Sequence, residues 1–387
     1  MIKNSLLNSH KLFLDLYSIE PDVISLAPGR INIIGEHTDY NLGFVLPAAI
    51  DRNIQFLAKR RKDNKISVWA ENFQERENFF VDDLKAAHTK KWVDYVKGIF
   101  WVLKKEGYSL GGIDSMIRGN IPLESGLSSS AALEVSILNA LNQLFHLSLS
   151  KEQIARLSQV AENDYVGVNC GLMDQFISVF GKKNTALFLD CETLKHEHVP
   201  LPLEEHGLNI VVYDSRVRRE LSASDYNKRR LESRAALKIL KTQKVKSFKD
   251  VDKSLIENKK NEMGDILFRR ARHVITENQR VKDAVRFIKT RDFQKLGGLL
   301  FQSHLSLRDD YEVSCPELDL LYEVGEKFGG CLGARMTGAG FGGSGIALVK
   351  EVETEAFVDK MKIESKVRQF SSPAFFKVSI DEGARIL

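Results

Sequence analysis

A short segment near the N-terminus concentrates side chains that can do chemistry. Between residues 27 and 40, in an otherwise apolar stretch, stand Arg30, Glu36, His37 and Asp39. Gly35 permits a sharp turn there, so these groups can converge. Carboxylates and an imidazole placed in this way can hydrogen-bond adjacent hydroxyls of a sugar. The same residue types also ligate metals, and a polar turn with local ion pairs needs no ligand, so the spacing leaves three interpretations open.

A second segment, residues 119–132, has the pattern of a strand end, a loop of small residues and the start of a helix. Ser128, Ser129 and Ser130 stand at that helix start. Free backbone N–H groups and the positive end of the helix dipole favour phosphate binding at such a junction, and a hydroxyl there can reach Mg²⁺. No lysine follows as it does in the GxxxxGK[ST] loop. Alternatively, the serines only cap the helix.

Two further segments carry weaker signals. Residues 333–345 include six glycines, which let the backbone approach a ligand closely or form a tight turn between strands. Asp174 follows Gly171 closely and stands among apolar neighbours. A carboxylate in that setting is either a general base or the N-cap of a helix.

These segments need a scaffold of mixed helices and strands. Apolar runs predict strands at 23–27, 44–50, 54–58, 113–117, 185–189, 208–213, 346–349 and 375–380. Helical spacing predicts helices at 92–105, 128–145 and 151–163, and a mostly helical, solvated surface at 226–302. This irregular order favours an α+β fold. A polar turn at 181–184 predicts domains at 1–180 and 181–387, with the last strand, near 374–387, as a candidate to return to the first domain.

Composition narrows the classes of function. The chain has 387 residues, 43% of them hydrophobic, and a net charge of +4. This is ordinary globular composition, and so small a surplus of positive charge gives no argument for a nucleic-acid or membrane partner. No apolar run approaches the roughly 18–20 residues of a membrane span. The four cysteines show no CxxC spacing, which favours a reducing, cytoplasmic location.

Taken together, the segments resemble the galactokinases, which stand within a larger family that also holds homoserine, mevalonate and phosphomevalonate kinases. The resemblance spans nearly the whole chain in the expected order. It rests on Gly29–Tyr40, which matches the galactokinase signature at every position, and on Pro122–Ala131, Ser303–Leu318 and Met336–Gly343. It implies an N-terminal domain like ribosomal protein S5 domain 2 beside a ferredoxin-like C-terminal domain, with the active site in the cleft between them. A monomer is expected, and no protein partner is implied.

The resemblance also implies a reaction, transfer of the γ-phosphoryl of ATP to the C1 hydroxyl of α-D-galactose with Mg²⁺ as cofactor, the first committed step of galactose breakdown. Asp174 would take the hydroxyl proton or orient the hydroxyl, and Arg30 would hold that carboxylate ionised. The sugar would contact Glu36, His37, Asp39, Gly171, Asp174 and Tyr226. The nucleotide would contact Trp92, Gly126, Leu127, Ser128, Ser129, Ser130 and Ala131, and Mg²⁺ would contact Ser130 and Glu162.

The same motifs are compatible with two alternatives: another sugar 1-kinase, for N-acetylgalactosamine or L-arabinose, and a non-catalytic galactose sensor. The intact segment 35–40 favours galactose, and the intact serine loop argues against a sensor. Three positions depart from the family pattern. Glu124 stands where the family usually has glycine, Arg219 where it often has histidine, and Ser344 where cysteine is common. A carboxylate at Glu124 would repel ATP unless it points outward or binds the metal.

Overall fold

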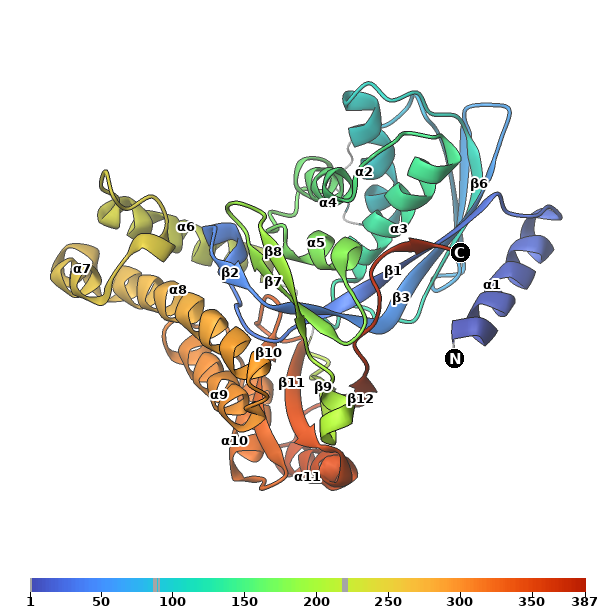
Figure 1. Cartoon of the computed structure of the whole chain (residues 1–387). Helices are drawn as coiled ribbons and strands as arrows, with labels where there is room; N and C mark the ends of the chain where they lie inside the picture. The colour runs from blue at the N-terminus through green and yellow to red at the C-terminus, as the bar shows by residue number, and fades with distance from the viewer. Residues whose placement is uncertain (1, 86–88, 90, 218–221) are drawn as a thin grey trace.

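In the part of the chain that the structure describes, the strands form three sheets, which helices cover (Figure 1). The computed structural model describes residues 2–85, 89, 91–217 and 222–387, so Arg219 lies outside the described residues. The largest sheet has six strands in the order β13-β1-β3-β6-β4-β5. Its strands are β1 (Val23–Asn32), β3 (Pro47–Arg60), β4 (Lys65–Ala70), β5 (Glu75–Phe80), β6 (Ile113–Gly119) and β13 (Arg385–Ile386).

Helices pack on both faces of this six-stranded sheet. Side chains of a strand alternate between faces, and β3 divides its residues accordingly. Phe56 and Ala58 belong to the large core beneath α3, whereas Leu57 belongs to a separate core with Phe13 of α1. Figure 1 shows the other helices of this half gathered on the side of α3. The helices are α1 (Ile2–Tyr17), α2 (Trp92–Lys105), α3 (Ser129–Leu144), α4 (Lys151–Val160) and α5 (Met173–Phe180).

The central strand corrects one prediction. The sequence predicts a break at 51–53 between two strands, but β3 runs through it, and its pairing with β1 shifts register between Pro28 and Arg30. The polar residues of this stretch find partners from the far end of the chain: the backbone N–H of Asp51 donates to the carbonyl of Ser379 at 3.0 Å. A distant segment thus satisfies backbone groups that would otherwise favour a turn.

The second half of the chain builds a four-stranded antiparallel sheet in the order β10-β11-β9-β12. Its strands are β9 (Leu208–Asp214), β10 (Cys331–Thr337), β11 (Ser344–Lys350) and β12 (Ala374–Val378). A small third sheet pairs β2 (Phe44–Val45) with β7 (Thr185–Asp190) and β8 (His196–Pro200). Strands on both sides of residue 180 therefore share one sheet, and β13 pairs with β1 while β12 pairs with β9. The domain boundary at 180 stays a prediction.

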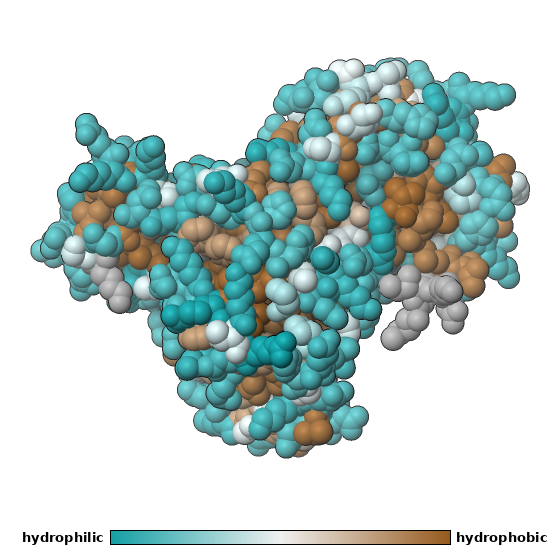
Figure 2. All heavy atoms as spheres, in the orientation of Figure 1, coloured by the Kyte–Doolittle hydropathy of each residue, from teal (hydrophilic) through white to brown (hydrophobic). Residues whose placement is uncertain are grey.

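Helices of the second half pack beside the four-stranded sheet, as Figure 1 shows for α8, α9 and α10. These helices are α6 (Ser222–Leu240), α7 (Lys253–Asn258), α8 (Lys260–Lys289), α9 (Phe293–Asp309), α10 (Pro316–Lys327) and α11 (Thr354–Val367). They enclose a core of their own with this sheet. In the part of the chain that the structure describes, no helix combines the length and apolarity of a membrane span. Figure 2 shows a mostly hydrophilic face with smaller hydrophobic areas.

Candidate active site

The centre of the candidate site is an ion pair between Arg30 on β1 and Asp174 on α5. Nε of Arg30 donates to Oδ1 of Asp174 at 2.8 Å, and Nη2 donates to Oδ2 at 2.7 Å. Nη1 donates to the carbonyl of Gly126 at 2.7 Å. Such a bidentate pair fixes both side chains in orientation as well as in distance. Asp174 is not a helix cap, because Leu172 occupies the N-cap position of α5.

Ser128 joins this pair from the start of α3. Its backbone is left-handed, with φ of +61°, and its side chain makes no capping hydrogen bond. The hydroxyl donates instead to Oδ2 of Asp174. The capping interpretation is therefore wrong for Ser128, because its hydroxyl donates to Asp174 and its oxygen accepts no hydrogen bond from the first N–H groups of the helix. The first N–H groups of α3 consequently lack a Ser128 cap, as an anion site requires.

The loop that precedes Ser128 is held from two directions. The N–H of Arg30 donates to the carbonyl of Leu127 at 3.0 Å, and Oγ of Ser344 donates to the carbonyl of Ser125 at 2.7 Å. Ser344 begins β11, directly after the glycine-rich turn of the β10–β11 hairpin. The glycine-rich segment thus forms the predicted tight turn between strands, and the end of this turn contacts the loop before Ser128.

Glu124 lies on the exposed side of the same loop. Its φ is +58°, a left-handed conformation that glycine adopts without strain. The backbone geometry therefore explains why a glycine would suit this position, independently of any charge effect. Because the side chain is exposed, solvent screens its charge strongly.

The polar segment near the N-terminus folds into a turn whose acidic groups lie close to Asp174. Oε1 of Glu36 accepts hydrogen bonds from the N–H of Gly338 at 2.7 Å and from Oγ1 of Thr337 at 3.2 Å. Asp39 touches Gly171, where an added Cβ would lie 1.8 Å from Oδ2 of Asp39. Burial first, and then the charge of Asp174, raise the pKa of Asp39 to about 7. Among the described residues Asp39 forms no ion pair, whereas Glu36 lies 3.5 Å from Nη2 of the buried Arg335.

His37 faces aromatic rings from both halves of the chain. Its Nδ1 lies 2.8 Å from the hydroxyl of Tyr40, and its ring centroid lies 5.7 Å from that of Tyr226 on α6. Burial lowers the pKa of His37 to about 3, so the imidazole is neutral near pH 7. The structure therefore brings Tyr226 to the N-terminal motif across nearly 190 residues of sequence.

Glu162 is one of the two residues predicted to hold a divalent cation. It lies on a π-helical turn, Ala161–Val166, that follows α4 and replaces the predicted regular helix. Its Oε2 accepts from Nε2 of Gln175 at 2.6 Å, and its carboxylate also interacts with the hydroxyl of Ser130. Burial first, and then Asp174, raise the pKa of Glu162 to about 7. A buried carboxylate beside a hydroxyl and without a cationic partner fits a Mg²⁺ ligand pair.

This pair does not form a complete cage of side chains. Among the described residues, no three histidine, cysteine, aspartate or glutamate side chains form a metal-binding group. Mg²⁺ needs none, because it keeps several waters and takes phosphate oxygens from its nucleotide. The four cysteines, all within the described residues, are free thiols.

Trp92 stands at the start of α2, on a different helix from the serine loop. Its Nε1 donates to Oε2 of Glu75 at 2.8 Å. Its ring is nearly parallel to that of Phe73, with an interplanar angle of 8° and centroids 6.4 Å apart. Phe73 is 43% exposed, so an aromatic surface is open to solvent here. Phe73 was not predicted as a site residue, because an isolated aromatic in a turn gives no signal.

The sequence interpretation also missed groups that hold the N-terminal motif from α8. Oε1 of Glu277 accepts from the N–H of Gly35 at 2.9 Å, and Nε2 of His273 lies 3.1 Å from the carbonyl of Glu36. Both side chains are fully buried, so the prediction of a solvated surface for 226–302 is wrong here. The available signal was their spacing, since residues four apart share one face of a helix.

Comparison with known proteins places this geometry in a family. The chain matches the GHMP kinases N terminal domain at residues 94–182, the galactokinase galactose-binding signature at 11–60 and the GHMP kinases C terminal domain at 256–366. The galactokinase of Clostridium acetobutylicum is 40% identical over 96% of this chain and 97% of its own length. That of Thermotoga petrophila is 46% identical over 84% and 89%, respectively.

Solved structures agree with these matches. The structure of Lactococcus lactis galactokinase complexed with galactose matches with a TM-score of 0.94 and 39% identity, over 99% of this chain and all of that one. Methanococcus jannaschii mevalonate kinase, at 18% identity and a TM-score of 0.66, shares the fold. Fold and site together define a GHMP kinase, an enzyme that transfers a phosphoryl group from ATP. Within that class, the chain belongs to the galactokinase family of sugar kinases. This confirms the resemblance, the two-domain α+β fold and the enzyme class predicted above.

Proposed function

We propose that the chain transfers the γ-phosphoryl of ATP to the C1 hydroxyl of α-D-galactose, giving galactose 1-phosphate and ADP. The observation that carries this proposal is the joint position of three groups. The carboxylate of Asp174 receives Arg30 on both oxygens and Ser128 on one of them. The carboxylate that would accept a hydrogen bond from the sugar hydroxyl therefore lies beside the start of α3, where we propose that the phosphates bind.

The chemistry at Asp174 follows from that arrangement. The carboxylate accepts the hydrogen of the sugar hydroxyl and aims the oxygen at the γ-phosphorus. Arg30 stabilises the negative charge of the carboxylate and of the transferring group. Phosphoryl transfer has a loose transition state, so orientation and charge neutralisation contribute more than proton abstraction does.

Sugar selection is assigned to Glu36, His37, Asp39, Gly171 and Tyr226. The polar side chains of Glu36 and His37 are buried, and those of Asp39 and Tyr226 are half-buried. A sugar that lacks the matching hydroxyl leaves such a group unpaired, and this rejects it more strongly than a loss of apolar contact would. The galactose in the Lactococcus structure supports this substrate.

The nucleotide is assigned to the start of α3, with Trp92 offering a flat surface to the adenine. Gly126, Leu127 and the following residues to Ala131 would surround the phosphates. Ser130 and Glu162 would hold Mg²⁺, which neutralises phosphate charge when it is bound. We also propose that the chain is a cytoplasmic monomer. Free cysteines and a nucleotide substrate suit the cytoplasm.

ADP release tests the proposal. The full chain is incubated with Mg-ATP and with galactose, glucose, N-acetylgalactosamine, L-arabinose or no sugar. Turnover with galactose alone is the expected result. Turnover with another of these sugars would replace the substrate and leave the phosphate assignment in place. Saturable galactose binding without turnover would identify a sensor instead.

A further inference from the structure

Tyr311 lies in the connection between α9 and α10, far from the catalytic ion pair in sequence, and is fully buried. Its hydroxyl lies 3.0 Å from that of Tyr40, whose oxygen in turn lies 2.8 Å from Nδ1 of His37. The ring of Tyr311 also packs on the imidazole directly, with centroids 4.9 Å apart. Two hydroxyls thus connect the C-terminal half to a histidine of the sugar pocket.

The backbone around Tyr311 is held by two arginines from different helices. Nη1 of Arg270 on α8 donates to the carbonyl of Asp310 at 2.5 Å. Nε of Arg229 on α6 donates to the carbonyl of Tyr311 at 2.6 Å, and Nη2 donates to that of Glu312 at 2.9 Å. Three consecutive carbonyls therefore accept from guanidinium groups, and the path of this loop is fixed.

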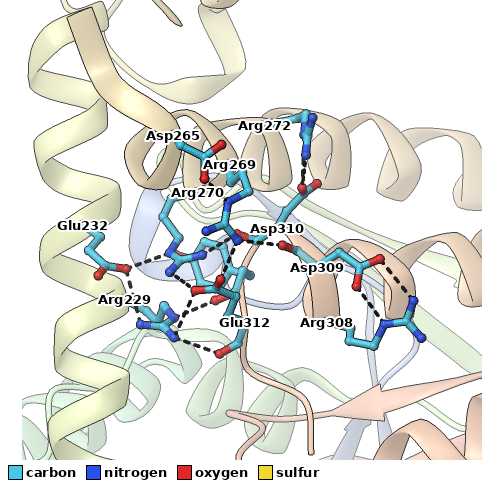
Figure 3. Close-up of polar contacts among 11 residues, drawn as sticks. Arg229, Glu232, Asp265, Arg269, Arg270, Arg272, Arg308, Asp309, Asp310 and Glu312 are labelled. Atoms are coloured by element: carbon cyan, nitrogen blue, oxygen red, sulfur yellow. Dashed lines mark hydrogen bonds and ion pairs between the residues drawn. The ribbon is translucent and has the colours of Figure 1, made fainter. Parts of the chain in front are cut away.

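Figure 3 shows how the charges of these arginines are balanced. Nε of Arg270 donates to Glu232 at 2.7 Å, and its Nη2 donates to Glu312 at 2.5 Å. Glu232 also lies 3.4 Å from Nη1 of Arg229. Only 1% of Arg270 and 8% of Arg229 is exposed. Burying two guanidinium groups is costly unless each is paired. Here both are paired with carboxylates, and both also donate to the backbone carbonyls of residues 310–312.

His37 needs such support because its backbone is left-handed, with φ of +61°. A residue with a Cβ adopts this conformation at a cost of about 1 kcal/mol, and its ring direction follows from the contacts around it. The hydroxyl of Tyr40 engages Nδ1, which leaves Nε2 for a sugar hydroxyl. Rotation of the imidazole would break this hydrogen bond and its packing against Tyr311.

We propose that Tyr311 is a positioning residue of the sugar pocket, which orients His37 through the hydroxyl of Tyr40. The inference rests on the proposed assignment of His37 to galactose. Arg229 and Arg270 fix the backbone around Tyr311. The hydroxyl of Tyr311 then holds the hydroxyl of Tyr40 in place, and that hydroxyl orients the imidazole of His37. Further along this connection, the carbonyl of Val313 accepts from the N–H of Phe341 in the glycine-rich turn at 2.7 Å. We therefore expect nucleotide affinity to stay unchanged when a substitution removes only the Tyr311 hydroxyl and leaves this backbone in place.

The test is galactose binding to the full chain without nucleotide, measured by titration calorimetry. Tyr311→Phe removes one hydroxyl and keeps the ring. We expect its Kd and KM for galactose to rise about five- to tenfold, with the KM for ATP unchanged. Tyr17→Phe is the control, because Tyr17 is a half-buried tyrosine whose hydroxyl donates to the carbonyl of Ser115 at 2.9 Å on the other side of the large sheet from α3. It should leave both constants unchanged.

A double-mutant cycle separates positioning from general loosening of the pocket. His37→Asn suits this purpose, since asparagine tolerates positive φ. If Tyr311 acts through His37, adding Tyr311→Phe to this variant should change the Kd by less than about twofold. An equal effect in both backgrounds, or an unchanged Kd in the single variant, would overturn the inference. If Tyr311→Phe unfolds, Tyr40→Phe interrupts the same connection. It is expected to give the same result, a higher Kd and KM for galactose with an unchanged KM for ATP. Wild-type chain that binds no galactose would instead reject the proposed function.

Discussion

Two acidic residues of this molecule, the half-buried Asp39 and the fully buried Glu277, differ in the charges around them. Burial and the neighbouring Asp174 raise the pKa of Asp39 to about 7. Burial acts in the same direction on Glu277, but cations around it, Arg280 first, outweigh burial and lower the pKa to about 2. Nε of Arg280 donates to Glu277 at 2.6 Å. Among the described residues, Glu277 forms an ion pair, with Arg280, and Asp39 forms none.

The difference separates groups that wait for a ligand from groups that hold the fold. Among the described residues, neither Asp39 nor Glu162 forms an ion pair, so a sugar hydroxyl or a metal ion can supply the missing partner. Glu277 is satisfied by Arg280, Ser303 and a backbone N–H. Perturbed carboxylates with an uncompensated charge mark functional sites more often than structural pairs do. We therefore expect substitutions in the first group to reduce turnover or ligand affinity and those in the second to reduce stability.

The largest effect is expected at the reaction centre. Asp174→Asn keeps the shape but removes the charge that accepts the sugar hydroxyl hydrogen, so kcat should fall about 10²–10⁴-fold. Galactose should still bind in calorimetry. Asp164→Asn, a half-exposed aspartate that pairs with Lys105 at 3.4 Å, is the control and should keep full turnover. Normal turnover of the Asp174 variant would remove it from the mechanism.

Next in size is the loss of a scaffold cation. Arg270→Met leaves the Asp310 carbonyl without its donor, and Glu232 and Glu312 keep only their contacts with Arg229 and Arg269, so the free energy of unfolding should fall by about 3 kcal/mol. Urea unfolding measures it. Arg286→Met is the control, since Arg286 is exposed and its single ion pair should contribute less than about 1 kcal/mol. An Arg270 variant as stable as the wild type would contradict the division between the two groups.

A smaller effect concerns the metal. Glu162→Gln removes the charge of the proposed Mg²⁺ ligand, so the Mg²⁺ concentration for half-maximal rate should rise at least about tenfold. The KM for galactose at saturating Mg²⁺ should change little. Direct Mn²⁺ binding to the protein with a non-hydrolysable nucleotide, followed by electron paramagnetic resonance, should weaken in parallel. Glu152→Gln, on the exposed side of α4, serves as control. Unaltered metal affinity would return Glu162 to a structural role.

The smallest effect is on the pH dependence of stability, and the two groups should differ in sign. The folded-state pKa of Asp39, about 7, exceeds its ordinary value of 3.8. The folded chain therefore holds this proton more tightly, and Asp39 makes stability fall as pH rises from about 4 to about 7. In Asp39→Asn this part of the decline should disappear, as thermal unfolding without ligands across that range would show.

Glu277 supplies the opposite case. Its folded-state pKa, about 2, lies below the ordinary 4.5, so its contribution to stability is present at neutral pH. It is lost as pH falls from about 4.5 towards 2. Glu277→Gln should be less stable at pH 7 and should lose less stability on acidification. Variants with the same sign of pH dependence would refute the comparison.

Much of the site could be predicted because its members stand in short segments. The stretch from Arg30 to Asp39 and the serine loop each keep their chemistry within a few residues, so type and spacing suffice to recognise them. The helix of Glu162 was predicted, but its π turn was not, since the widened turn depends on how the segment packs rather than on local propensity. Phe73 and Tyr311 were missed, because single aromatics resemble core residues in sequence.

The sequence alone determined the family, the fold class, and the residue types that meet ATP and a sugar, because local patterns encode strands, helices and loops directly. Tertiary structure alone decided which carboxylates have a cation and which lack one. Glu277 and Asp39 are both acidic residues in the sequence, yet Arg280 lies beside Glu277 and Asp174 lies beside Asp39. The energy of a buried charge depends on the neighbours within a few ångströms, and only folding brings those neighbours together.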